Sequence, residues 1–176
     1  MRISLELATR NPVYQSTATK FFEHFLGIAE AMTQQNGRLG LWDEQDHFYH
    51  NVLRRPDGSV IPMRLFSLVG LFPLFAVEVL EPDMLERCPE FAERLQWVLN
   101  HRSDLAKLVS HWDVEGQGSR RLLSLLRGHR MKALLRRMLD ETAFLSPYGV
   151  RSVSREHLAK PFELDVDGQH FSVGYV

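Results

Sequence analysis

The sequence contains one cysteine, Cys88, among 176 residues, and no long hydrophobic run. A single thiol excludes an internal disulfide and a multi-cysteine zinc site. The longest largely apolar segment, Leu65 to Val77, contains Gly70 and Pro73 and is too short to span a bilayer, which takes about 20 residues. The N-terminal residues also lack the apolar stretch of a signal peptide. We therefore expect a cytoplasmic protein that does not contact a membrane.

The sequence also lacks an excess of charge of either sign, because its formal net charge is -1. One basic segment contains no Asp or Glu, and its cations are Arg120, Arg121, Arg127, Arg130, Lys132, Arg136 and Arg137. No aromatic residue is interleaved with them, and leucines supply an apolar side. We interpret this segment as a solvated helix face and expect no nucleic-acid partner.

Motifs that identify a reaction from local spacing are missing. The sequence has no Gly-rich phosphate loop, no G-x-S-x-G elbow and no context for a cysteine nucleophile. Any catalytic assignment must therefore rest on more than one short motif.

Helical spacing dominates the first 140 residues. A helix is predicted from Pro12 through Met32 to a stop at Gly37, and both Phe21 and Phe22 are apolar, as in a helix packed on two neighbours. Further helices are predicted over Leu65–Leu80, over Met84–Leu99, briefly from Ser103, and over Leu122–Leu139 with a kink near Gly128. The spacing thus predicts five or six helices.

The last residues follow a different period. Two runs with alternating apolar and polar residues flank Asp167-Gly168, which is a strong signal for a β-hairpin over residues 161–175. We therefore predict one mainly α domain over residues 1–176, with a C-terminal β-hairpin.

The segment from Leu41 to Asn51 concentrates groups that can carry chemistry. It contains three carboxylates, two imidazoles and three aromatic rings, which together suit a sugar. The same segment can supply a metal site from Asp43, Asp46, His47 and His50, or can be a solvated loop anchored by its aromatics. Spacing alone leaves the three alternatives open, and we expect no metal or cofactor.

A second candidate segment runs from Phe144 to Ser154. A Pro-Tyr-Gly turn pins this loop, so that Tyr148 and Arg151 can hydrogen-bond hydroxyl groups or a carboxylate. Alternatively, Ser154 caps a short helix that begins near Arg155.

Several segments in this order resemble a known family. They are Trp42-Asp43-Glu44 leading to Phe48-Tyr49, Arg54 to Gly58, Ser67 to Glu78, Thr19 to Phe25, and Phe144 to Ser152. Together they resemble the helical domain of glycoside hydrolase family 63, a group of α-glucosidase-like enzymes. The resemblance implies that the chain is the central part of an (α/α)6 toroid, so the fold expected is a partial toroid of helices.

The resemblance also implies a function. The family cleaves α-linked glucosides with inversion, so the partner implied is a carbohydrate, and the substrate-side residues implied are Trp42, Asp43, Tyr49, Tyr148 and Arg151. The family's acid and base segments precede and follow the part that this chain matches. We therefore expect a glycosidase fragment that is inactive alone and that self-associates through its open helical edges. The alternative is a non-catalytic helical interaction module that binds a protein or another acidic partner.

Overall fold

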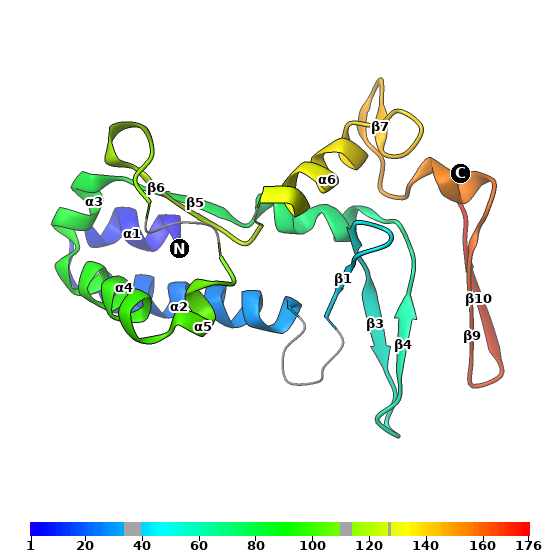
Figure 1. The fold of residues 1–176 in the computed structure, drawn as a ribbon, viewed down its shortest axis with the longest axis horizontal. Helices are drawn as coiled ribbons and strands as arrows, with labels where there is room; N and C mark the ends of the chain where they lie inside the picture. Colours follow the sequence, from blue (N-terminus) through cyan, green and yellow to red (C-terminus); the bar gives the residue numbers. More distant parts are fainter. Residues whose placement is uncertain (34–39, 110–113, 127) are drawn as a thin grey trace. The chain divides into compact units, whose positions relative to one another are not determined.

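The computed structural model describes residues 1–33, 40–109, 114–126 and 128–176. The predicted helix stop at Gly37 lies outside the described residues. The chain divides into two compact units, and the chain passes from the first to the second and back (Figure 1). Unit 1 comprises Met1–Leu39 and Ala76–Arg127, and unit 2 comprises Gly40–Phe75 and Gly128–Val176. Each unit has its own core.

Unit 1 is built mainly of helices with one strand pair. Its helices are α1 (Arg2–Ala8), α2 (Tyr14–Met32), α3 (Pro82–Arg87), α4 (Pro89–His101), α5 (Ser103–Ala106) and the 3-10 turn η2 (Gln117–Ser119). Its strands β5 (Val77–Leu80) and β6 (Arg121–Ser124) pair antiparallel. Prolines occupy the first position of α3 and of α4, where a missing N–H costs little.

The core of unit 1 forms where α2 packs on α1 and α4. The rings of Phe22 and Phe91 meet edge to face with their centroids 6.0 Å apart, and both side chains are fully buried. Gln15 is also buried on α2, and its side-chain oxygen accepts hydrogen bonds from the backbone N–H groups of Glu90 and Phe91. This glutamine thereby satisfies free donors in the first turn of α4.

Unit 2 consists of small antiparallel hairpins around one α-helix and two 3-10 helices. Its elements are β1 (Trp42–Asp43), β2 (Phe48–Tyr49), β3 (Asn51–Arg54), β4 (Val60–Met63), η1 (Leu68–Phe75), α6 (Gly128–Met138), β7 (Leu145–Ser146), β8 (Gly149–Val150), η3 (Arg155–Leu158), β9 (Phe162–Val166) and β10 (Gln169–Val173). The pairs are β1 with β2, β3 with β4, β7 with β8, and β9 with β10.

The core of unit 2 centres on Phe48. This ring is fully buried, stacks on Phe144 at a centroid distance of 5.9 Å, and lies against the backbone of Gly70 in η1. Leu71 of η1 and Leu134 of α6 complete the buried cluster. The first candidate segment therefore supplies a core residue as well as its polar groups.

The prediction of a mainly α, partial (α/α)6 toroid is wrong. The described residues contain five separate two-stranded antiparallel sheets between the helices, which makes the fold mixed α and β. The segment from Trp42 to Met63 forms two hairpins, where a toroid requires helices. The turn at Pro56-Asp57-Gly58 reverses the second of these hairpins.

Two predicted helices are also partly strand. The range Leu65–Leu80 contains only η1 as a helix, and then Val77–Leu80 forms β5. Pro73 in η1 has no N–H and its ring would clash with a carbonyl of the preceding turn, so a regular α-helix cannot continue there. The range Leu122–Leu139 begins as β6, and α6 starts at Gly128. An apolar run in β6 is paired by a strand distant in sequence, and periodicity alone cannot reveal this.

No helix in the described part of the chain is both long enough and apolar enough to cross a membrane.

Candidate functional site

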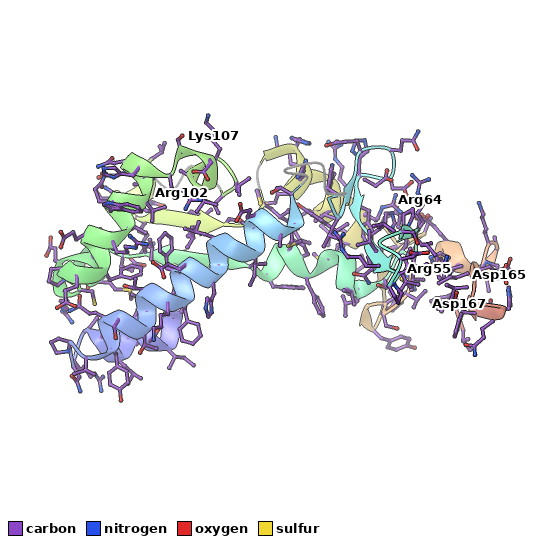
Figure 2. The ribbon with its side chains drawn as sticks, turned by 90° about the horizontal axis from the view of Figure 1, so that it is seen from below. Arg55, Arg64, Arg102, Lys107, Asp165 and Asp167 are labelled. Carbon is purple, nitrogen blue, oxygen red and sulfur yellow. The ribbon has the colours of Figure 1, made fainter. Side chains whose placement is uncertain are left out.

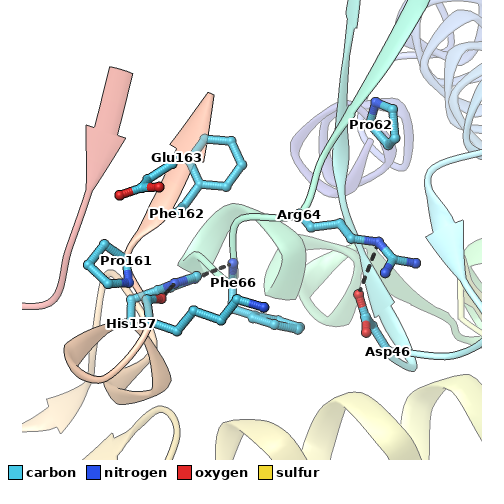
Figure 3. Close-up of a pocket in the computed structure, with 9 residues that line it drawn as sticks. Asp46, Pro62, Arg64, Phe66, His157, Pro161, Phe162 and Glu163 are labelled. Atoms are coloured by element: carbon cyan, nitrogen blue, oxygen red, sulfur yellow. Dashed lines mark hydrogen bonds and ion pairs between the residues drawn. The ribbon is translucent and has the colours of Figure 1, made fainter. Parts of the chain in front are cut away.

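Unit 2 contains an open cleft between the base of the β3–β4 hairpin and the base of the β9–β10 hairpin. Its volume is about 420 Å³. The residues that line it are Asp46, Pro62, Arg64, Phe66, His157, Lys160, Pro161, Phe162 and Glu163 (Figure 3). The cleft thus combines two carboxylates and two cations with aromatic and proline surfaces.

One wall carries a fixed charge network. Arg64, one residue beyond β4, donates from Nη2 to Asp43 Oδ2 at 2.6 Å, and its Nε lies 3.7 Å from Asp46 Oδ2. Asp43 Oδ1 accepts hydrogen bonds from the N–H groups of Gln45 and Asp46. The Asp46 N–H, with Arg64 and the Gln45 N–H adding to it, lowers the pKa of Asp43. Asp43 is therefore held as an anion that orients Arg64.

Behind this wall lies a buried imidazole. His50 is almost fully buried between the rings of Phe48 and Phe66, and its Nε2–H donates to Asp46 Oδ2 at 2.8 Å. Its Nδ1 has no hydrogen-bond partner among the described residues. Asp46 is thus fixed by His50 from behind and by Arg64 from the side, with its carboxylate at the cleft.

The opposite wall belongs to β9 and the residues just before it. Exposure alternates along β9, so Phe162 is half-buried and Glu163 is exposed. Lys160 and Pro161 precede the strand and are exposed. Among the described residues, neither Lys160 nor Glu163 takes part in an ion pair. One wall therefore offers charges that are held in place, and the other offers the exposed charges of Lys160 and Glu163, of which Glu163 also acts electrostatically on His170.

His157, which is buried in η3, also lines the cleft. Its Nε2 accepts a hydrogen bond from the backbone N–H of Phe66 at 3.0 Å, and its Nδ1 lies 2.9 Å from the Lys160 carbonyl oxygen. A carbonyl oxygen can only accept, so Nδ1 carries the proton and the ring is neutral. Both ring nitrogens of His157 are used in backbone contacts, which makes His157 a structural link.

The Ser154 side chain accepts a hydrogen bond from the backbone N–H of Glu156, which confirms the alternative that this serine caps a short helix.

The predicted residues of the first segment meet beside β1 and β2. Trp42 and Tyr49 are paired across the two strands, with their ring centroids 4.9 Å apart. The guanidinium of Arg130 lies 4.9 Å from the Trp42 ring, and its Nη2 donates to Glu44. The pKa of Glu44 is lowered first by the nearby indole N–H of Trp42, although Trp42 Nε1 makes no hydrogen bond of normal geometry among the described residues, and then by Arg130. Burial raises the pKa of Tyr49. These rings are packed against protein groups, and none of them lines the cleft.

The predicted residues of the second segment lie apart from the cleft lining. Tyr148 is fully exposed at the β7–β8 turn. Arg151 donates to the carbonyl oxygens of Glu141 and Leu145 and to the hydroxyl of Tyr175, so its guanidinium ties backbone segments together. The role of Trp42, Asp43, Tyr49, Tyr148 and Arg151 as substrate contacts stays a prediction, and Asp43 reaches the cleft only through Arg64.

The metal alternative has no support in the described residues, where no group of three or more His, Cys, Asp or Glu side chains is arranged to hold an ion. His50 and Asp46 bond to each other, and Asp43 bonds to Arg64.

The basic segment is largely paired. Its ion pairs are Arg120–Glu81, Arg121–Glu115, Arg130–Glu44 and Arg137–Glu156. Arg127 lies outside the described residues. Four of the six described cations of this segment are therefore compensated by carboxylates from other segments.

Sequence reasoning missed Phe162, Glu163, Lys160 and Arg64 as cleft residues. Phe162 and Glu163 belong to a run whose alternation signals only a hairpin, and Arg64 beside an apolar stretch suggests a surface residue. No local pattern links them, because the cleft forms between segments about 100 residues apart in sequence. Of the cleft residues, Asp46 lies in the first candidate segment, and Arg64 and Phe66 lie in Met63–Pro73, a segment whose composition indicates mainly core.

Comparisons with known proteins give one informative match. No protein-family model matches the chain, and no solved structure matches it. The chain is 40% identical over 190 aligned residues to Uncharacterized protein YMR196W of Saccharomyces cerevisiae. The alignment covers 100% of this chain and 17% of that protein.

The resemblance to glycoside hydrolase family 63 is overturned by these findings. The relative carries no described activity, no family model supports the assignment, and the hairpins of both units are incompatible with a toroid made of helices. The chain is instead similar along its whole length to one part of a much longer yeast protein that is uncharacterized.

Proposed function

We propose that unit 2 is a non-catalytic binding module and that its cleft takes a carbohydrate. The observation that carries the proposal is the composition of the cleft, in which Asp46 and Glu163 face the same space as Arg64 and Lys160 beside the ring of Phe162. Carboxylates accept hydrogen bonds from hydroxyl groups and cations donate to them, while an aromatic face packs on the C–H groups of a sugar ring. Binding sites of this kind are concave and combine apolar surface with a few placed polar groups.

The arrangement favours binding over hydrolysis. Asp46 already accepts a hydrogen bond from His50, and its Oδ2 lies 3.7 Å from Arg64 Nε, so these two protein groups hold its carboxylate in one orientation. His157 uses both ring nitrogens in backbone contacts. The remaining carboxylate, Glu163, is exposed on β9, where water solvates its charge.

The test is titration of the purified chain with methyl α-D-glucoside, maltose and cellobiose, followed by NMR of the backbone amides. We expect an affinity on the order of 1 mM, or about 4 kcal/mol, with the largest shifts at residues 160–164. Glu163→Gln and Phe162→Ala should each weaken binding by about tenfold, because each removes one direct contact.

Two control variants make this test specific. Glu141→Gln changes an exposed carboxylate away from the cleft lining and should bind normally. Tyr148→Ala removes the fully exposed ring of the β7–β8 turn. If Tyr148→Ala abolishes binding while Phe162→Ala leaves it unchanged, the sugar site is not the cleft.

We propose a cytoplasmic location for this binding activity. Its support is the single thiol, Cys88, which is buried and needs no oxidising compartment. Microscopy of a fluorescent fusion tests it, and a signal confined to a membrane-bound compartment would contradict it.

A second candidate function is self-association through α2 of unit 1. The wide apolar stripe of this helix is only half covered, because Phe22 is fully buried whereas Phe21 is 47% and Ile28 is 54% exposed. Gly27 lies beside them, and an added Cβ there would meet no atom within 4 Å. A glycine inside a helix costs about 1 kcal/mol relative to alanine, and no close contact with the described residues requires a glycine at this position.

A second copy of the chain fits this face. An antiparallel pair of α2 helices centred on His24 places Phe21 of one copy opposite Gly27 of the other, so a large side chain meets a small one twice. Sedimentation of the wild type should show a concentration-dependent dimer that Phe21→Ser with Ile28→Ser abolishes. Ile3→Ser on α1, also highly exposed, is the matched control and should dimerise. A wild type that stays monomeric at its highest soluble concentration would exclude this function.

A further inference from the structure

The two hairpins that form the cleft are joined at their tips. Arg55, at the turn between β3 and β4, donates from Nη2 to Asp167 Oδ1 at 2.7 Å, and Asp167 lies at the turn between β9 and β10 (Figure 2). No backbone pairing links the hairpins, because β3–β4 and β9–β10 are separate sheets. We call the Arg55–Asp167 contact the tip ion pair.

The opposite ends of these hairpins are joined much more firmly. The Ser154 N–H donates to the Phe66 carbonyl oxygen at 2.9 Å, and the Phe66 N–H donates to His157 Nε2 at 3.0 Å. The Leu68 N–H also donates to the Ser152 carbonyl oxygen at 2.8 Å. The cleft adjoins this fixed base. On one side Pro62 lies near the end of β4 and Arg64 one residue beyond it, and on the other side Pro161 directly precedes β9 and Phe162 begins it (Figure 3).

Two prolines keep the two hairpins from pairing edge to edge as one sheet. Pro62 in β4 has no N–H to donate, which is tolerated only at a strand edge and interrupts pairing with a further strand. Pro161 directly precedes β9 and has the same effect at the start of that strand. The gap between the hairpins is therefore maintained, and one side-chain contact spans it at the tips.

From this geometry we infer that the tip ion pair is a releasable closure between the two hairpins at their tips, and that its opening widens the approach to the cleft, which lies beside their fixed base, for a ligand. The inference rests on the proposed function for what the ligand is, but not for the opening itself. Release is easy because both side chains are substantially exposed, and exposed ion pairs are weak and screened by salt.

The turn chemistry fits a closure that can be made and broken. Asp167 and Gly168 have φ values of 51° and 77°, the left-handed turn typical of Asp-Gly hairpins, which fixes where the Asp167 carboxylate is presented. Arg55 has a second carboxylate nearby, because its Nη1 lies 4.0 Å from Asp57 Oδ2 in its own turn. When the tip ion pair opens, the Arg55 charge can be compensated within the β3–β4 turn.

The decisive experiment measures the distance between the tips. Spin labels are placed at Ser59→Cys and Gln169→Cys in the full chain, where buried Cys88 does not compete for the label, and distances are recorded by pulsed electron paramagnetic resonance. In low salt we expect one narrow distribution. In 1 M NaCl, where the Debye length is about 3 Å, and in Asp167→Asn, the distribution should broaden toward longer distances. Asparagine keeps the left-handed turn, so only the charge is lost.

The control variant is Asp165→Asn, which removes a carboxylate from the same hairpin whose partner is His170. It should leave the distances unchanged, and Arg55→Lys should keep most of the narrow population. Identical distributions in wild type, in Asp167→Asn and at both salt concentrations would overturn the inference.

A kinetic measurement links the opening to the site. With methyl α-D-glucoside as the probe, NMR exchange should show association and dissociation rates that both rise about three- to tenfold in Asp167→Asn, with a smaller change in affinity. Salt-insensitive tip distances together with normal sugar binding would refute the closure and leave the carbohydrate function standing. Salt-sensitive tip distances without sugar binding would support the closure and refute the carbohydrate function.

Discussion

At the scale of single residues, Gly70 is the position with the least freedom. It lies in η1 directly against the buried ring of Phe48, and an added Cβ would collide with that ring and lie 2.5 Å from the Tyr49 carbonyl oxygen. Gly70→Ala should therefore destabilise unit 2 by about 1–3 kcal/mol, because neither the ring nor the backbone can move away. Urea unfolding followed by near-UV circular dichroism measures the change.

Gly27 is the matched control for this prediction. Its position in α2 is open, so Gly27→Ala should raise the free energy of unfolding by up to about 1 kcal/mol. Equal effects of the two substitutions would show that Phe48 does not pack on Gly70.

Asp43 gives a pH-dependent prediction. Its pKa is lowered below the ordinary value of 3.8, first by the N–H of Asp46, so the stability that it contributes is present above that value and is lost as the pH falls through the lowered pKa. Asp43→Asn should cost about 1 kcal/mol of unfolding free energy at pH 7, and the difference from wild type should vanish near pH 2. A difference that persists at pH 2 would mean that the carboxylate charge does not hold the β1–β2 turn.

At the scale of elements, the β9–β10 hairpin contains a titrating cross-strand pair. His170 lies opposite Asp165 and donates from Nδ1 to Oδ1 at 2.8 Å. This hydrogen bond raises the pKa of His170 above the ordinary 6.5. The pair therefore stabilises the hairpin fully below pH 6.5 and ceases to do so as the pH rises through the raised pKa.

NMR titration of the imidazole protons tests this. The pKa of His170 should fall back toward 6.5 in Asp165→Asn, and the amide hydrogens of residues 162–173 should exchange faster below pH 6.5 in that variant than in the wild type. Asp167→Asn, in the same hairpin, should leave the His170 pKa high. An unchanged pKa in Asp165→Asn would contradict the pairing.

At the scale of the whole molecule, the chain forms two compact units that each contain residues distant in sequence. Cys88 is fully buried in unit 1, between α3 and α4, and burial raises the pKa of its thiol. We predict that a thiol reagent labels Cys88 only as unit 1 opens, so the labelling rate should follow the denaturant dependence of unfolding. Rapid labelling of the native protein at a rate independent of urea would contradict this, and a peptide containing the same cysteine provides the unprotected rate.

Local patterns predicted the elements whose stabilising contacts are local. The helical spacing of apolar residues after Pro12 predicts a helix, and α2 forms there, although of the predicted apolar stripe only Phe22 and Ala29 are buried while Phe21 and Ile28 are exposed. Asp167-Gly168 indicates a turn, and β9 and β10 pair around it. The mistakes concern β5 and β6, whose leucines and valines fit a helix equally well, because their pairing partners are more than 40 residues apart in sequence.

The candidate site shows the same division. The sequence marked Asp43, Asp46 and His50 as chemically rich, and they do form a connected network with Arg64. It did not mark Lys160, Phe162 or Glu163, which face that network from the start of the β9–β10 hairpin. The alternating pattern of that hairpin predicts strands and gives no sign of a binding site. A pattern reports on a residue's neighbours in the chain, whereas a cleft depends on which segments meet.

The sequence by itself determined the balance of charge, the single thiol, the amphipathic α2 and the Asp-Gly turn, because composition, helical period and backbone preference act over a few residues. Only the tertiary structure decided that β5 and β6 pair where helices were predicted, that Arg64 and Asp46 face Phe162 and Glu163, and that Arg55 meets Asp167 at the hairpin tips. These features join residues far apart in sequence, and their free energy arises only after the chain has brought those residues together.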